Sequence, residues 1–431
     1  MKYHDFEVLA THVKSIKGSG ENRMTFQVQV PRSPAGECLE GISSEYETHE
    51  MWEHLKGLDD WSKVITLGNW LTNILFPSTI SDLLVRSLDV VRSSQEGLRI
   101  RLLLEGELHN IPWEYLLLNR GGGEATVTDL LGLMPNVSIV RHQAAAIPAW
   151  DITAELPAQM IVALASPATY PPLNLKEEQR VIEQALGENP YMKATFVPNA
   201  TSATLLPDIK PSHLFHFAGH GDFEKQMGSS PGTIEGKGVL IVDDGRGHPE
   251  RVSASQLALQ LRQVGVRVAV LGACQSGRRD NTNVWSSVAT ALLKADLGAV
   301  VGMQDTVKDK SAIAFAKTFY RALVSGLPID EAVTSGRIAI ACTDPKGWGI
   351  PVLYLRSPDG VVFPEYTADP GLEETRKQLR VTARQRIKEL HGKAITVDIG
   401  RMTKGTVEAE QNIDVARERS EATTVKIKDL G

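Results

Sequence analysis

The sequence predicts an α/β protein built on a mostly parallel β-sheet that is covered by helices. From residue 151 onward, short apolar runs of strand type alternate with amphipathic segments of helical spacing. Strands that alternate with helices in this way favour a parallel sheet with helices on both faces. The chain has 431 residues, of which 42% are hydrophobic. It is therefore long enough to bury a large core without disulfides or a structural metal.

The composition argues against several other classes of protein. Lys and Arg number 46 against 52 Asp and Glu, so the formal net charge is −6, whereas a dedicated nucleic-acid binder needs a basic face. The three cysteines form no C-x-x-C pair, which argues against a structural zinc site, and an odd number suits a reducing compartment. The first residues carry no apolar run of signal-peptide type, and no run has the length of a membrane span. We therefore expect a soluble cytoplasmic protein that binds neither nucleic acid nor membrane directly.

Residues 1–150 are predicted to form an N-terminal scaffold lobe. Residues 1–35 contain two β-branched, apolar segments separated by the polar turn KGSGEN, a pattern that indicates a hairpin. Apolar side chains recur at helical spacing over 45–96, and 97–106 has the pattern of a strand. We expect this lobe to pack a sheet of its own beside the sheet of the next lobe.

Residues 151–366 are predicted to form the second lobe, which repeats a strand–helix rhythm. Strands are expected at 159–166, 194–199, 212–221, 266–277, 298–305 and 351–357. Helices are expected at 174–188, 286–296, 310–326 and 329–342. Loops that carry chemistry in such sheets lie at the carboxyl ends of the strands.

Residues 367–431 contain no Phe, Trp or Tyr and are predicted to be an appended tail. A segment without aromatic residues buries little apolar surface by itself. Residues 373–391 have the pattern of a charged helix, and short Val/Ile patches such as 395–399 suggest strands. Two interpretations remain open: a small β module on which an activating or sensor protein docks, and a partly disordered extension.

Two glycine-flanked loops contain the residues most suited to covalent chemistry. His220 lies between two glycines at the end of one predicted strand, and Cys274 follows Gly272 and Ala273 at the end of another. A histidine can take the proton of a thiol and so create a nucleophilic thiolate. Glycines let the backbone approach a reacting carbonyl and present N–H groups to an oxyanion. A single cysteine is more often a small core residue, so the pair is the informative feature.

Five segments, in this order along the chain, resemble the motifs of one family. They are LLEGELHNIPWEYLLL (103–118), HLFHFAGHG (213–221), VAVLGACQSG (268–277), GAVVGMQDTVKDKSAIAFAKTFYRALVSGLPIDEAV (298–333) and WGIPVLYLRS (348–357). On these motifs the chain resembles the CHAT-domain cysteine peptidases, a branch of the caspase-like clan that includes separase, metacaspases and gingipain. The resemblance implies a caspase-like, mostly parallel sheet flanked by helices, with an inactive, pseudo-peptidase-like N-terminal lobe and a small C-terminal appendage.

The resemblance also implies roles for individual residues. Cys274 is expected to be the nucleophile and His220 the general acid and base. The backbone N–H groups of Gly221 and Cys274 are expected to form the oxyanion hole. The clan needs no third carboxylate, and we expect neither a metal nor another cofactor.

The residues of the substrate groove are less specific. Asp222 and Asp305 are candidates, although a loop cap and a helix N-terminal cap are the simpler interpretations of these two residues. Trp348 lines the groove or packs the closing strand. Basic-specific members of the clan often carry Asp two residues before the cysteine, where this chain has Gly272, and this departure puts a preference for Arg or Lys in doubt.

Motif order and spacing exclude other enzyme classes. Class I glutaminases and papain-like enzymes place the cysteine before the histidine, and here His220 comes first. A metal site built on His213 and His216 is disfavoured because side chains three residues apart in a strand point to opposite faces. The polar segments 222–237 and 277–285 are predicted to be loops, one or both of which are mobile until a substrate or activator orders them.

The function expected from the sequence is therefore that of a cysteine endopeptidase. Its substrate is expected to be a specific protein partner, and its role that of a regulated effector in bacterial antiviral defence or cell death, as the resemblance implies. The alternative is a non-catalytic scaffold that uses the same fold to bind partner proteins.

Overall fold

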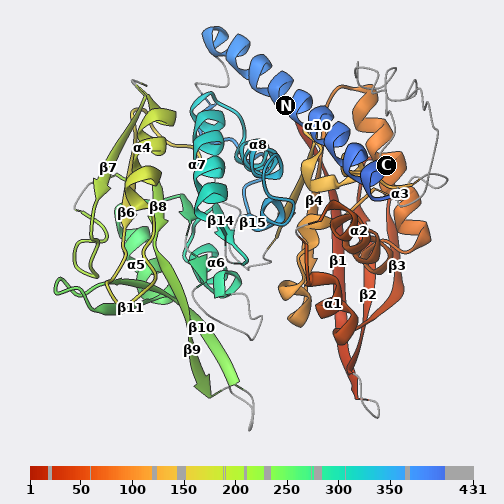
Figure 1. Cartoon of the computed structure of the whole chain (residues 1–431), viewed down its shortest axis with the longest axis horizontal. Coiled ribbons are helices and arrows are strands. Elements are labelled where there is room, and N and C mark those ends of the chain that lie inside the picture. The colour runs from red at the N-terminus through yellow and green to blue at the C-terminus, as the bar shows by residue number, and fades with distance from the viewer. Residues whose placement is uncertain are drawn as a thin grey trace.

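A computed structural model describes residues 1–17, 22–58, 60–118, 124–142, 152–187, 189, 191–207, 211–227, 234–272, 274–275, 284–305, 307–364 and 369–402. Within this part of the chain, an 11-stranded sheet runs through the molecule in the order β3-β2-β1-β4-β5-β15-β14-β12-β8-β6-β7. Only the pairs β1–β2, β2–β3 and β14–β15 are antiparallel. The predicted fold class, a mostly parallel sheet flanked by helices, is confirmed (Figure 1).

The N-terminal third begins with the predicted hairpin and extends it by one strand. The three strands are β1 (Tyr3–Lys17), β2 (Asn22–Arg32) and β3 (Cys38–Glu47). Three helices follow in the region predicted to be helical: α1 (Thr48–Leu55), α2 (Trp61–Leu75) and α3 (Ser78–Ser93). Asp60 caps α2 by accepting a hydrogen bond from the Ser62 N–H, and both α2 and α3 bury a leucine-rich face.

The sheet of this N-terminal lobe is not separate from that of the second lobe, contrary to the prediction. Strands β4 (Gly97–Leu104) and β5 (Val137–Arg141) extend it, and β5 pairs in parallel with β15 (Pro351–Leu355). Both strands of that junction are buried along their whole length. Two completely buried strands are more stable when they pair with each other than when each leaves the hydrogen-bonding groups of one edge unpaired. The sheet is therefore continuous, and one core spans both lobes.

The second lobe contains the predicted alternation of strands and helices. Its other strands in the large sheet are β6 (Ala158–Leu164), β7 (Met192–Val197), β8 (Leu214–Ala218), β12 (Val268–Leu271) and β14 (Ala299–Met303). Its helices are α4 (Leu175–Leu186), α5 (Ala254–Val264), α6 (Val284–Lys294), α7 (Asp309–Val324) and α8 (Ile329–Ala341). Helix α4 packs against α7, whereas α5 packs against α6. The segment 238–265, which contains α5, has no counterpart among the predicted elements.

A second, 4-stranded sheet contains the segment that was predicted to be a long loop. Its order is β11-β10-β9-β13, and its strands are β11 (Pro249–Ser253), β10 (Ile234–Asp243), β9 (His220–Met227) and β13 (Cys274–Gln275). The β9–β10 hairpin extends away from the large sheet (Figure 1). The loop prediction for 222–237 is therefore wrong over most of its length, because cross-strand hydrogen bonds order this polar sequence. Residues 228–233, and 277–283 of the other predicted loop, lie outside the described residues, and the last two residues of that loop, 284 and 285, begin α6.

The C-terminal region described begins with α10 (Glu373–Met402), which crosses one end of the molecule and packs against α8 (Figure 1). Arg380 anchors it through an ion pair with Glu331, at 2.6 Å between Nε and Oε1. The helix continues through 395–399, so the prediction of a strand there is wrong. β-branched residues disfavour a helix only slightly, and here they continue a helix that the preceding residues have already formed. The remaining tail patches, beyond residue 402, lie outside the described residues. No helix in the described residues is long and apolar enough to cross a membrane.

Candidate active site

The candidate site lies where β8 of the large sheet passes into β9 of the small one. All five residues of β8 are buried, which fixes the strand in the core. Gly219 makes the transition possible, since a Cβ atom there would lie 2.5 Å from the Phe217 ring and 2.9 Å from the Ala165 carbonyl oxygen. His220 is the next residue and begins β9.

The backbones of the two glycine-flanked loops lie side by side. Cys274 and Gln275 form the short strand β13, which pairs in parallel with the start of β9. The register places the backbone of Cys274 opposite His220 and that of Gln275 opposite Gly221. The side chain of Cys274 lies outside what the structure describes. The backbone alone brings together two residues that are 54 positions apart in the sequence.

The imidazole of His220 is held in one orientation by a backbone carbonyl. Its Nε2 lies 2.9 Å from the Pro171 oxygen, and because a carbonyl only accepts, Nε2 carries the proton. The Tyr170 ring lies against the imidazole, with 5.0 Å between ring centroids. The other nitrogen, Nδ1, is buried and has no hydrogen-bond partner within the described residues. The neutral ring therefore presents Nδ1 as an unused proton acceptor.

Burial sets the protonation of His220. The side chain is 1% exposed, and burial lowers the pKa of His220 below its ordinary value of 6.5, while the Pro171 carbonyl and the Asp309 carboxylate partly oppose that change. Desolvation disfavours the charged form of a histidine. The ring is therefore neutral at neutral pH and able to accept a proton.

Sequence reasoning missed Pro171. A backbone carbonyl has no residue-type signature, so only the fold reveals that the loop after β6 supplies the acceptor for His220 Nε2. Gly221, the other residue expected in the oxyanion hole, lies in β9 between Leu240 of β10 and Gln275 of β13.

The two acidic groove candidates are engaged in ion pairs. Asp222 lies on β9 and contacts Arg251, at 3.0 Å between Oδ2 and Nη2. Asp305 contacts Lys346, at 2.8 Å between Oδ2 and Nζ, and it does not cap α7, whose N-cap residue is Lys308.

Trp348 cannot line a groove, and its groove assignment is wrong. Its side chain is 0% exposed and packs edge-on against Tyr115, with 4.9 Å between ring centroids. It therefore belongs to the core beneath the closing strand, which is the second of the two interpretations open from the sequence.

Two other histidines lie in β8 or just before it, and each makes a structural contact of its own. His213 accepts a hydrogen bond from the Gln159 N–H through Nδ1, at 3.1 Å. His216 instead contacts Glu178 and Tyr320. Among the residues that the structure describes, no group of three or more His, Cys, Asp or Glu is placed to hold a metal ion.

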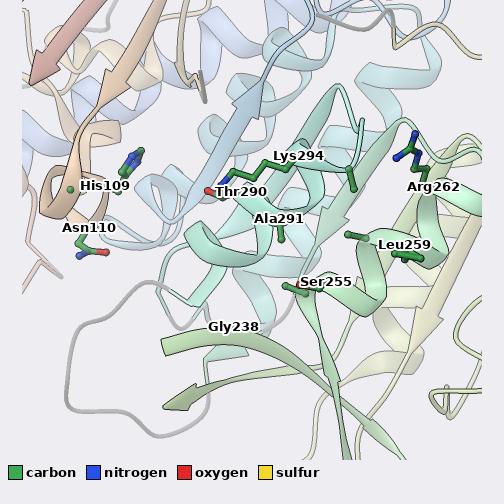
Figure 2. Close-up of a pocket in the computed structure, with 13 residues that line it drawn as sticks. His109, Asn110, Gly238, Ser255, Leu259, Arg262, Thr290, Ala291 and Lys294 are labelled. Atoms are coloured by element: carbon green, nitrogen blue, oxygen red, sulfur yellow. The ribbon is translucent and has the colours of Figure 1, made fainter. Parts of the chain in front are cut away.

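A cleft of about 670 Å³ lies apart from His220, between η1 (Gly106–Asn110) and helices α5 and α6. Figure 2 shows His109 and Asn110 on one side, with Leu259 and Lys294 on the other. Burial lowers the pKa of His109 to about 4, so this imidazole is uncharged at neutral pH. The cleft contributes no group to the pair formed by His220 and Cys274.

No curated protein matches the chain significantly. The yeast (Saccharomyces cerevisiae) separase of the separase–securin complex is 14% identical, with a TM-score of 0.37 over 72% of this chain and 20% of that one. The Arg-specific cysteine proteinase gingipain R is 12% identical, with a TM-score of 0.43 over 73% of this chain and 76% of that one. The chain thus spans about a fifth of the length of separase.

The match to a family model covers most of the described core. The model of the CHAT domain matches residues 66–361, a range that begins in α2 and includes the histidine and cysteine loops. The chain belongs to the CHAT domain family.

Proposed function

We propose that this chain is a cysteine endopeptidase that uses Cys274 and His220. One observation carries the proposal most directly: the β9–β13 pairing sets the Cys274 backbone beside His220, a buried histidine whose Nδ1 has no hydrogen-bond partner among the described side chains. A thiol needs such a base to become a nucleophile at neutral pH. Membership of the CHAT family supports the same assignment.

The geometry supports a two-step acyl transfer. Nδ1 of His220 accepts the thiol proton, and the Cys274 sulfur attacks the carbonyl carbon of the scissile bond. The backbone N–H groups of Gly221 and Cys274 hold the oxyanion. The imidazolium then protonates the leaving amine, which leaves a thioester. Water, deprotonated by His220, hydrolyses the thioester and restores the thiol.

We propose further that the substrate is a specific protein partner and that the chain is a regulated effector in defence or cell death. In this proposal, 1–150 is a scaffold, 151–366 carries catalysis, and 367–431 is the docking region of an activating or sensor protein in the cytoplasm. The polar outer part of the β9–β10 hairpin near the site and the charged, partly exposed helix α10 favour protein contacts.

The test is a peptide-library digest combined with labelling by a peptidyl chloromethyl ketone. The expected result is cleavage of library peptides and one thioether adduct on Cys274, formed by sulfur attack on the methylene carbon with loss of chloride. Cys274→Ala loses both. Cys38→Ala is the matched control and keeps both, because Cys38 lies on β3, far from the site in the sheet order. Equal cleavage by the wild-type chain and Cys274→Ala would refute the proposal.

The pH profile of the same cleavage is expected to follow His220. Because burial lowers the pKa of His220 below 6.5, the base stays neutral to a lower pH than a free histidine does. The acidic limb of kcat/KM is therefore expected to have its midpoint below pH 6.5. A midpoint at or above pH 6.5 would show that another group controls this limb.

A further inference from the structure

The segment 165–173 (ASPATYPPL) connects β6 to α4 and carries two groups that contact the His220 imidazole. One is the Pro171 carbonyl, which accepts the hydrogen bond from Nε2. The other is the Tyr170 side chain, whose ring lies against the imidazole. Nothing in the proposed reaction mechanism uses Tyr170, so this contact has no assigned function.

Two consecutive prolines restrict the backbone that carries both groups. A proline ring fixes its own φ at about −65° and pushes the residue before it toward an extended conformation. Pro171 and Pro172 follow Tyr170 directly, so the Tyr170 backbone and the Pro171 carbonyl have few alternative conformations. The ring and the carbonyl are therefore presented to His220 from one rigid stretch of chain.

Backbone hydrogen bonds hold this segment in place without any contribution from His220. The Tyr170 N–H donates to the Pro167 oxygen at 3.0 Å, which closes a turn. The Ala168 N–H donates at 3.2 Å to the oxygen of Gly247, between β10 and β11. The small sheet that contains His220 in β9 thus also anchors the segment that contacts it.

The hydrogen bond to Pro171 alone leaves one rotation of the imidazole poorly restrained. Nε2 lies close to the axis of the Cβ–Cγ bond, whereas Nδ1 is bonded to Cγ and swings widely when the ring turns about that axis. This terminal torsion of a histidine is broad. A hydrogen bond to Nε2 therefore fixes the direction of the His220 side chain more tightly than the plane of its ring.

The Tyr170 ring restrains that plane. Its centroid lies 5.0 Å from the centroid of the imidazole, and the two ring planes are inclined by 38°, a separation typical of aromatic rings in contact. A larger turn of the imidazole about Cβ–Cγ would bring its edge into the face of the phenol ring. The direction in which Nδ1 of His220 points therefore depends on this contact.

The contact acts through the ring and not through a charge. Burial and the Asp222 carboxylate raise the pKa of Tyr170 above its ordinary value of 10.0, and Arg251 partly opposes them. The phenol is therefore uncharged at neutral pH. Asp222 and Arg251 form an ion pair with each other, at 3.0 Å, so together they add little net charge beside the imidazole.

We propose that Tyr170 is a positioning residue, whose ring keeps the His220 imidazole in the plane that directs Nδ1 toward the neighbouring strand β13, which contains Cys274. The inference rests on the proposed peptidase function. Strand β13 pairs with the start of β9 directly at His220, and Nδ1 has no hydrogen-bond partner among the described side chains. Without the Tyr170 ring, the imidazole spends less time in the orientation that accepts the thiol proton.

The first test is steady-state kinetics on the best library peptide, with thermal unfolding measured in parallel. Tyr170→Leu removes the aromatic face but keeps a large apolar side chain. It is expected to lower kcat by about 10-fold or more with KM within about twofold of wild type, since a misplaced base slows the reaction and leaves substrate binding intact. Tyr170→Phe keeps the ring and is expected to restore kcat to within about threefold of wild type.

Tyr191→Leu is the matched control and is expected to leave kcat within about twofold of wild type. The Tyr191 side chain is 41% exposed. Its carbonyl accepts a hydrogen bond from Ala158 at the start of β6, whereas the segment 165–173 follows the end of that strand.

A second test needs no peptide. Iodoacetamide forms a thioether with the Cys274 thiolate and releases iodide, so the rate of this alkylation, followed by mass spectrometry, measures how readily His220 takes the thiol proton. Alkylation of Cys274 is expected to be about 5-fold slower or more in Tyr170→Leu, and to have the wild-type rate in Tyr170→Phe.

The outcomes separate the positioning role from the peptidase activity. Slower alkylation in Tyr170→Leu that Tyr170→Phe restores supports the positioning role even if the wild-type chain cleaves no library peptide. Cleavage that requires Cys274, or alkylation of Cys274, at the wild-type rate in Tyr170→Leu overturns the positioning role and leaves the peptidase proposal intact. A higher KM with unchanged kcat would assign Tyr170 to substrate binding, and equal losses in both Tyr170 variants would assign the effect to the hydroxyl. Either of these results also overturns the inference.

Discussion

Replacement of His220 by alanine is expected to lower kcat/KM for peptide cleavage by about 10³-fold or more. The variant loses the buried base that the β9–β13 pairing sets beside Cys274, and a positioned general base contributes roughly 10²–10⁴-fold. The same residue returns the proton to the leaving amine, so both halves of the reaction are affected. Steady-state kinetics on the best library peptide, with thermal unfolding measured in parallel, checks the prediction.

The control is His248→Ala. His248 lies between β10 and β11 with its side chain 68% exposed, so its removal is expected to change kcat/KM by less than about twofold. His220→Asn is a second variant, which retains polarity without basicity and is expected to be as inactive as His220→Ala. If either His220 variant kept more than a tenth of wild-type activity while folded, His220 would not be the general base.

The sequence predicted the parts of this site that depend on buried strands. Apolar runs before His220 and Cys274 predicted that each residue follows the end of a strand, and in the structure these two strands, β8 and β12, pair in parallel. The spacing of apolar residues along the sequence indicates which segments are buried, and burial fixes the place of these strands in the sheet.

The features that the sequence did not predict depend on contacts that leave no pattern in the local sequence. The outer part of the β9–β10 hairpin, 222–227 with 234–238, has a mostly polar sequence, and its order comes from cross-strand hydrogen bonds. The Pro171 carbonyl requires no particular side chain. Glu178 reads as an ordinary acidic residue in the first turn of a helix, and only the fold brings it to His216 and Gly272.

The IPWE segment (111–114) belongs to one of the motifs on which the resemblance to the family depends, and the structure shows the contacts that its side chains make. Trp113 is 0% exposed, and its Nε1 donates to the Leu108 oxygen at 2.9 Å. Glu114, also 0% exposed, accepts two hydrogen bonds from Arg141 at the end of β5, at 3.1 and 2.8 Å. Gln304, which follows β14, donates to the same carboxylate at 2.9 Å. Glu114 therefore connects the N-terminal lobe to the loop that follows β14.

Replacement of Glu114 by alanine is expected to lower the free energy of unfolding by about 3–5 kcal/mol, the usual cost of removing one partner of a buried ion pair. Two guanidiniums depend on this carboxylate. Arg141 is 1% exposed, and burial lowers the pKa of Arg337 to about 10, an effect that Glu114 opposes. Among the described residues, Arg141 has no other carboxylate in ion-pair contact, and the Arg337 guanidinium donates to the Pro351 carbonyl instead. The variant therefore leaves the buried Arg141 without its ion pair and removes a negative charge that acts on the buried Arg337.

Urea unfolding, monitored by tryptophan fluorescence, measures this effect. The control is Glu40→Ala on the exposed part of β3, whose free energy of unfolding is expected within about 0.5 kcal/mol of that of the wild type. Glu114→Gln separates charge from shape, since the amide keeps a hydrogen-bond acceptor for Arg141 but loses the negative charge. If charge compensation dominates, Glu114→Gln is nearly as destabilised as Glu114→Ala. If Glu114→Gln matches wild type, hydrogen-bond geometry holds the junction. If Glu114→Ala matches Glu40→Ala, the continuous sheet alone joins the lobes, because pairing of β5 with β15 then suffices without the polar network beneath it.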